Sequence, residues 1–228
     1  MQFKERLLQG TLIKRYKRFF VDILHKNKKI TAHCPNSGSM LGLLNKGSNV
    51  WFSSSDNKKR KLKYTLEIIQ QEKNLVGVNT HLTNKIIKEA LLEKKIPELP
   101  SISSIKSEAV FDKNTRFDFL LKNYNKKVFV EVKNVTLSRK KGLAEFPDAK
   151  TERGKKHLMK LVEAQKKGFD SFIIYLVQRN DCENFKIADD IDPEYKKAHD
   201  YAKKNKVKIL CYDCQINNQE VKLNKRIL

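Results

Sequence analysis

Long apolar runs are missing from this 228-residue sequence. No run approaches the roughly 20 apolar residues that a membrane-spanning helix needs. The first ten residues, MQFKERLLQG, also lack the apolar core of a secretory signal peptide. These two absences argue against a membrane protein, and we expect a cytoplasmic protein with no membrane partner.

Cysteine is scarce as well. The four cysteines, Cys34, Cys182, Cys211 and Cys214, are too few and too unevenly placed for a disulfide framework in a chain of this size. Cys211 and Cys214 form a CxxC pair, but no second Cys or His pair stands at zinc-finger spacing. The pair also follows an apolar run, as at the end of a strand. We therefore expect reduced thiols, with no metal at this pair.

Acidic residues are also few. The chain has 26 of them against 48 lysines and arginines, which gives a formal net charge of +22. Such a charge produces a long-range field that favours a polyanion, nucleic acid first of all. An anionic membrane surface is the competing partner. A Lys-rich proteome would explain the excess of Lys over Arg, but not the shortage of acids.

The first 80 residues are rich in short β-type segments, separated by clusters of Gly, Asn, Ser and Lys. The segments are residues 10–16, 18–24, 29–33, 49–54, 64–69 and 75–79. Five or six closely spaced strands predict a small barrel, of which the OB type is a common nucleic-acid-binding form. Trp51 lies in a continuous apolar run, which favours a place in the core over base stacking.

From residue 83 the pattern changes to helical spacing, with Thr83 as the expected cap and apolar residues at 86, 87, 90 and 91. We therefore divide the chain into two domains, 1–81 and 82–228. The second domain should contain strands near 105–111, 115–121 and 127–134, then a helix from Thr151 to Gly168. A strand at 171–178, a helix from Pro193 to about Asn205 and a strand at 207–212 complete a mixed α/β (α+β) fold.

Charged residues interrupt two of these strands. Residues 116–134 read as an antiparallel hairpin, in which Asp118 can lie near Glu131, and Glu131 and Lys133 share one strand face. The structural interpretation is a half-exposed sheet with an ordinary Glu–Lys pair. The functional interpretation is a site that uses all three charges.

Several motifs give the chain a resemblance to a known family. They are HisCysProAsnSerGlySerMet at 33–40, GlyValAsnThr at 77–80, ArgPheAspPheLeuLeu at 116–121, ValGluValLysAsnValThrLeu at 130–137 and PheProAspAlaLysThrGluArgGlyLysLysHisLeu at 146–158. Together they resemble the sugar fermentation stimulation protein family over essentially the whole chain. The order of elements with Asp118, Glu131 and Lys133 also resembles the PD-(D/E)XK nuclease superfamily. The resemblance implies an OB-like barrel joined to a restriction-endonuclease-like mixed-sheet domain, DNA binding, and a regulatory link to maltose metabolism.

The nuclease resemblance assigns roles to four residues. Asp118 and Glu131 would be the carboxylate ligands of Mg²⁺ or Mn²⁺, because these ions prefer oxygen ligands and keep several waters. Lys133 would orient a water and offset transition-state charge. Glu89 matches the extra acid that many members of the superfamily carry on the first helix. Its structural interpretation is an exposed helix residue with Lys85 and Glu93 as neighbours.

Nine residues are candidates for nucleic-acid contacts. Four lie in an aromatic-rich strand region where alternation would expose a stacking and phosphate-binding surface, two lie in a turn-forming loop, and three lie at a helix start. They are Lys14, Arg15, Lys17, Arg18, Ser37, Ser39, Arg153, Lys155 and Lys156. The loop could instead be structural or meet the neighbouring domain, and Thr151 could simply cap its helix. Cys34 beside His33 is no catalytic pair, because adjacent strand residues face opposite sides.

Three functions remain open at this point. The first is a DNA-binding protein without sequence specificity, and the second is a Mg²⁺-dependent nuclease that cleaves phosphodiester bonds at Asp118, Glu131 and Lys133. The third is a basic scaffold whose partner is RNA or an acidic protein. The sequence does not decide the oligomeric state, a homodimer included.

Overall fold

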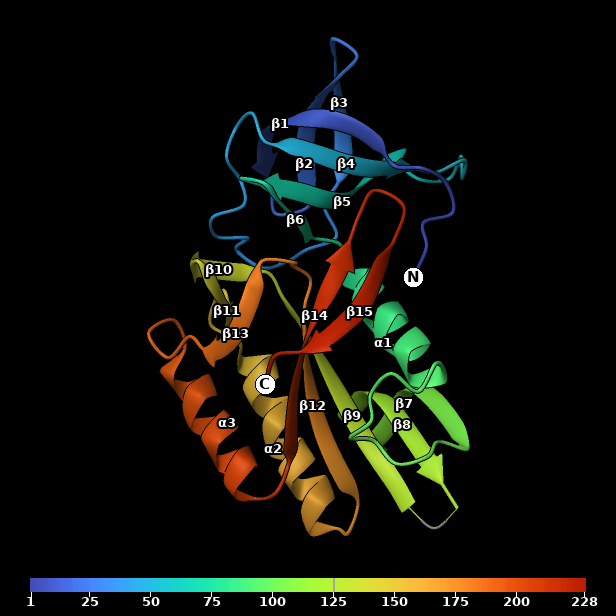
Figure 1. The fold of residues 1–228 in the computed structure, drawn as a ribbon, viewed down its shortest axis with the longest axis vertical. Helices are drawn as coiled ribbons and strands as arrows, with labels where there is room; N and C mark the ends of the chain where they lie inside the picture. Colours follow the sequence, from blue (N-terminus) through green and yellow to red (C-terminus); the bar gives the residue numbers. More distant parts are fainter. Residues whose placement is uncertain (125) are drawn as a thin grey trace.

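The computed structural model of the chain describes residues 1–124 and 126–228. It shows two β-rich units in contact, a barrel and a larger mixed-sheet unit beneath it in Figure 1. Within the described residues, none of the helices combines the length and the apolar character needed to cross a membrane.

The N-terminal unit is a closed barrel. Its strands are β1 (Leu8–Tyr16), β2 (Phe20–His25), β3 (Lys28–His33), β4 (Asn49–Ser54), β5 (Tyr64–Gln71) and β6 (Asn74–Gly77). They lie in the order β3-β2-β1-β4-β5-β6, and a parallel pairing of β3 with β5 closes the ring. Closure removes the exposed strand edges of an open sheet. The predicted OB-like barrel is confirmed.

The C-terminal unit is built on a mixed sheet of six strands in the order β15-β14-β12-β9-β8-β7. The strands are β7 (Ser104–Asp112), β8 (Thr115–Asn123), β9 (Lys126–Val135), β12 (Asp170–Val177), β14 (Lys208–Ile216) and β15 (Val221–Arg226). Helix α1 (Thr83–Leu92) shares one core cluster with this sheet, and α2 (Glu152–Lys166) and α3 (Pro193–Lys204) share another. Strand β9 is central and buried on both faces, so a charged residue in it needs a partner.

A second, three-stranded sheet stands beside the main one. It consists of β10 (Leu137–Lys140), β11 (Gly142–Phe146) and β13 (Cys182–Ile187) in the order β10-β11-β13. The sequence did not predict this sheet, nor β15. These strands are short or carry charged residues on both faces, so they lack the clear alternation by which a strand is recognised.

The helix ends follow local chemistry, with one correction. The Thr151 hydroxyl accepts a hydrogen bond from the Gly154 backbone N–H at 3.1 Å, which confirms the predicted cap of α2. The predicted Thr83 cap is wrong. A 3₁₀ helix, η1 (Thr80–Leu82), precedes α1, and Asn79 caps that helix instead. The Thr83 hydroxyl instead lies 3.3 Å from the Asn134 side-chain oxygen and accepts from Gln178.

One loop makes several of the contacts that join the two units, beside the Gly77 N–H bond to the Gln178 carbonyl at 2.9 Å and the Arg179 bond to the Gln71 side chain at 2.8 Å. The loop 33–40 of the barrel meets residues 146–150 of the second unit. The Ser39 hydroxyl donates to the Asp148 carbonyl at 2.7 Å, and the Met40 N–H donates to the Asp148 carboxylate at 3.1 Å. Gly38 is needed there, because a Cβ at this position would lie 2.5 Å from the same carboxylate. The loop therefore fixes the barrel on the second unit.

The remaining predictions for single residues are structural. Trp51 is half-buried and packs against the core beside α1, as expected. Cys211 and Cys214 are free, buried thiols that face opposite cores, so they do not form a common metal site. Cys34 points into the barrel core, where its thiol meets the Met40 sulfur at 3.5 Å.

Candidate metal site and nucleic-acid surface

Asp118 lies where β8 and β9 separate. The pairing of the two strands reaches Phe119 opposite Val130 and goes no further. Beyond it the Asp118 carboxylate takes the place of the missing strand contact, because its Oδ2 accepts from the Val132 N–H at 2.7 Å. Its Oδ1 accepts from the Asn84 amide of α1 at 2.7 Å. Asp118 thus bridges the central strand and the first helix.

Glu131 is the second carboxylate of the site and is 3% exposed. Its Oε1 accepts from the Lys133 ammonium at 2.6 Å, and the same oxygen contacts Nδ1 of His157 on α2. Its Oε2 is buried and has no hydrogen-bond partner among the described residues. Such an orphaned oxygen is costly unless it meets a donor or a cation.

The two carboxylates differ in their electrostatics. Burial, together with the negative charge of Glu131, raises the pKa of Asp118 to about 6. Burial alone would also raise the pKa of Glu131, but the Lys133 charge and the His157 contact lower it below its ordinary value. Asp118 is therefore the carboxylate whose charge its surroundings do not offset, because burial and Glu131 outweigh Lys133 and the two hydrogen bonds.

The donor set fits a divalent cation of the magnesium type. Within the described part of the chain, no group of three or more His, Cys, Asp or Glu side chains could enclose a metal. Mg²⁺ does not need such a cage, because it keeps several waters and often binds through one or two carboxylates. The orphaned Oε2 of Glu131 and the raised pKa of Asp118 both show where positive charge is lacking.

The structure does not bring Glu89 to this site. Its carboxylate lies 2.8 Å from the N-terminal ammonium of Met1, on the part of α1 that meets β15. Asn84, one turn earlier on the helix, is the residue that reaches Asp118. Sequence reasoning missed Asn84 and His157. The only available signal for His157 was its place within the PheProAsp to HisLeu motif.

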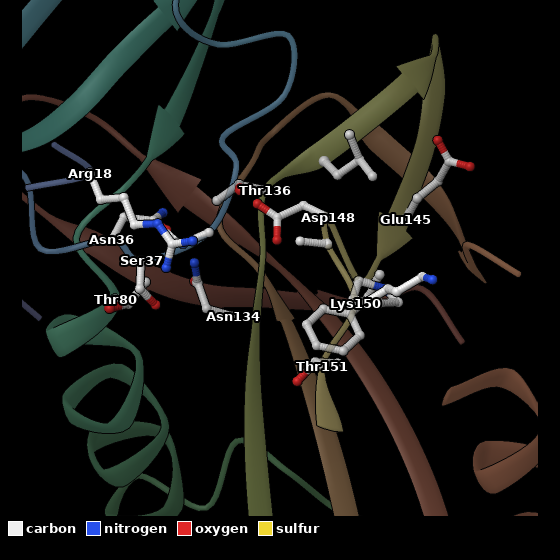
Figure 2. Close-up of a pocket in the computed structure, with 15 residues that line it drawn as sticks. Arg18, Asn36, Ser37, Thr80, Asn134, Thr136, Glu145, Asp148, Lys150 and Thr151 are labelled. Atoms are coloured by element: carbon white, nitrogen blue, oxygen red, sulfur yellow. Dashed lines mark hydrogen bonds between the residues drawn. The ribbon is translucent and has the colours of Figure 1, made fainter. Parts of the chain in front are cut away.

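A cavity of about 390 Å³ lies between the two units (Figure 2). Arg18, Asn36 and Ser37 form one side of it, and Lys150 of the second unit forms the other. Asn134, which follows Lys133 on β9, lies between them. The exposed Arg18, Ser37 and Lys150 thus meet around one cavity, whose lining also contains the acids Glu145 and Asp148.

A second cavity, of about 610 Å³, adjoins the cluster at His157. Its basic lining residues are Arg116, Arg153, Lys156 and Lys113, and its acids are Glu108 and Asp112. Asp112 is already paired with Lys160 at 2.8 Å. The predicted residues Arg153 and Lys156 therefore lie together at one end of the site, with basic groups in excess.

Other predicted binding residues have partners within the protein. The Arg15 guanidinium donates to the backbone carbonyls of Asn36 and Gly38 at 2.7 and 3.0 Å, so it fixes the loop 33–40. Lys155 pairs with Glu194 at 3.2 Å. Ser39 bonds to the second unit, as described above. Lys14 lies 5.5 Å from the ring of Tyr16, and Lys17 is exposed in the β1–β2 turn.

Comparison with known proteins agrees with this architecture. The family model described as the SfsA N-terminal OB domain matches residues 13–78, and the one described as the sugar fermentation stimulation protein RE domain matches residues 81–220. The described structure is similar to that of Pyrococcus furiosus SfsA in complex with Ca²⁺, with a TM-score of 0.90 and 20% identity. That alignment covers 100% of this chain and 96% of the other, and it shows the common fold.

Sequence relatives match over the full length. A sugar fermentation stimulation protein homolog from Pelagibacter ubique is 55% identical over 227 residues, which cover 100% of this chain and 98% of the relative. A homolog from Caulobacter vibrioides is 42% identical over 230 residues, with 100% and 96% covered. The chain belongs to the sugar fermentation stimulation protein family.

Proposed function

We propose that this protein binds DNA through its phosphates, without sequence specificity, and holds a divalent cation at Asp118 and Glu131. The observation that carries the proposal is the place of the carboxylate cluster beside a cavity whose lining has basic groups in excess, reached at His157. The cavity between the two units, at Asn134, adds Arg18 and Lys150, and its lining also contains Glu145 and Asp148. A duplex or single strand laid along this surface would place a phosphate near the cluster.

The charge of the whole chain supports the same partner. A formal charge of +22 attracts DNA, while contacts to phosphates alone carry no sequence information. The P. furiosus protein, whose fold is similar, was solved in complex with Ca²⁺, and we infer that this chain binds a divalent cation as well. The regulatory link to maltose metabolism stays a prediction that rests on the family resemblance alone.

The experiment is a titration of labelled duplex DNA, followed by fluorescence anisotropy at several salt concentrations. We expect log K to fall linearly with log salt, because each phosphate contact releases bound counterions. Unrelated sequences should compete equally well. Binding that ignores salt, or that is directed to anionic lipid vesicles in place of DNA, would contradict the proposal.

A second candidate function is phosphodiester hydrolysis at the same site. The observation that favours it is the Lys133 ammonium, which is held 2.6 Å from the Glu131 carboxylate and is still 14% exposed. A bound divalent cation would neutralise phosphate charge and lower the pKa of a water. Lys133 would lie beside the reacting phosphate and stabilise the charge that develops in the transition state.

Cleavage of labelled DNA in Mn²⁺ tests this second function. Lys133→Ala should keep DNA binding and lose cleavage, whereas Asp118→Asn should lose cleavage together with metal binding. A preparation whose cleavage survives in both variants carries a contaminating nuclease. If the parent does not cleave, the site serves binding alone.

A further inference from the structure

Three aromatic rings form a row across the junction of the two units. Phe19 belongs to the turn between β1 and β2, His33 ends β3, and His81 belongs to η1 at the start of the second unit. The ring centroids of Phe19 and His33 are 6.4 Å apart, and those of His33 and His81 are 6.5 Å apart. We call these three residues the ring row.

The ring row is open to solvent and held by the backbone. Phe19 is 44% exposed, His81 is exposed and His33 is half-buried. The Cys34 N–H donates to the Phe19 carbonyl at 2.8 Å, and the Thr80 hydroxyl donates to the Pro35 carbonyl at 2.7 Å. These bonds hold the β1–β2 turn, the end of β3 and η1 together, so the rings are in place before any ligand arrives.

The groove beside the ring row has suitable chemistry for a nucleic-acid strand. It has a volume of about 900 Å³, and its lining contains His33 and His81. Its charged residues are four cations, Lys4, Arg6, Arg60 and Lys85, and three acids, Glu5, Asp56 and Glu67. Burial, and to a lesser extent the neighbouring His81 and Arg60, lowers the pKa of His33, which favours its neutral ring. Both carboxylate oxygens of Glu67 in this groove are already bonded to neighbouring side chains.

The ring row also leads to the carboxylate cluster. His81 is followed on the next helical turn by Asn84, whose amide holds Asp118 at 2.7 Å. At the other end, Arg18 precedes Phe19 and reaches the cavity between the two units. A strand that follows the ring row therefore has phosphate-binding groups at one end and the cluster at the other.

We propose that the ring row of Phe19, His33 and His81 stacks the bases of an unpaired DNA strand and directs its phosphates toward Asp118 and Glu131. This inference rests on the proposed function, because the phosphate contacts supply the remaining affinity. Rings stack on every base with little sequence preference, while a duplex keeps its base faces stacked inside. The ring row therefore selects a single strand.

The test measures the affinity of the full chain for two probes, a labelled oligothymidylate of about ten nucleotides and a random duplex. Phe19→Ala should weaken binding to the oligothymidylate roughly tenfold, since a stacked base contributes about 1–3 kcal/mol. Phe19→Tyr should retain the affinity of the parent, and His81→Ala should also weaken it. Tyr201→Ala is the matched control, because this tyrosine is 40% exposed on α3, away from the ring row.

The outcomes separate this inference from the proposed function. A loss confined to the single strand supports the ring row. An equal loss for duplex and single strand, or no loss in Phe19→Ala, overturns the ring row and leaves phosphate binding in place. If the parent binds neither probe at low salt, the inference fails together with the proposed function.

Discussion

Replacing Asp118 by Asn should stabilise the metal-free protein at pH 8. The carboxylate is buried beside Glu131 and its pKa is raised to about 6, compared with 3.8 in an unfolded chain. Above pH 6 the Asp118 carboxylate of the folded protein is therefore charged, and this buried charge destabilises the fold. The amide of Asn can accept from the Val132 N–H and donate to Asn84 once that side chain turns over, so the hydrogen bonds survive.

The magnitude follows from the pKa difference. A folded-state pKa above the unfolded value means that the folded protein binds more protons between pH 4 and 6, so its stability falls as the pH rises through that window. Each pKa unit is worth about 1.4 kcal/mol, so the raised pKa of Asp118 lowers the free energy of unfolding of the parent by about 3 kcal/mol at pH 8. For a chain of this length, that is a rise in Tm of roughly 6–12 °C for Asp118→Asn.

The assay is thermal unfolding in EDTA at pH 4.5 and pH 8, with parent and variant side by side. Asp118→Asn should exceed the parent at pH 8 and lose most of that advantage at pH 4.5. Asp112→Asn is the control, because pairing with Lys160 lowers the pKa of Asp112 to about 2 and its loss should destabilise. If Asp118→Asn is equally destabilised at both pH values, the Asp118 charge does not destabilise the folded protein, and its pKa is not raised as described.

Two further substitutions test other parts of the site. Glu131→Gln should act in the opposite direction to Asp118→Asn and lower the stability by about 3 kcal/mol, because it removes the negative charge that pairs with Lys133. If urea unfolding shows a variant as stable as the parent, the buried ion pair does not stabilise the fold. Arg15→Ala should cost about 2–3 kcal/mol through its lost bonds to backbone carbonyls, whereas the exposed Lys14→Ala should change stability by less than about 0.5 kcal/mol. Equal effects of Arg15→Ala and Lys14→Ala would show that the Arg15 bonds to the loop 33–40 do not stabilise the fold.

Much of the fold could be predicted from local patterns. The hairpin of β8 and β9 follows from its two β-rich apolar runs with a polar segment between them, and the two-residue period of a strand puts Glu131 and Lys133 on one face. Thr151 and Pro193 predicted the helix starts, because caps act within a few residues. The same hairpin brings Asp118 near Glu131, although the strand pairing ends one residue earlier, at Phe119 and Val130.

The rest depends on contacts between distant segments. Nothing local shows that Glu89 meets the N-terminus, or that Asn84 and His157 reach the carboxylates. Arg15 looked like a phosphate ligand because its neighbours are basic and aromatic, yet the loop 33–40 offers it carbonyl groups at closer range. Tertiary packing decides which partner such a side chain finds, and local sequence patterns do not show these long-range contacts.

The most direct test of the account is calorimetric titration of the folded parent and of Asp118→Asn with Mn²⁺. We expect weak binding to the parent and none to Asp118→Asn, with thermal unfolding confirming that both are folded. Identical titrations without binding heat would contradict the central claim that Asp118 and Glu131 hold a divalent cation, and the proposed DNA binding would then rest on the basic surface alone.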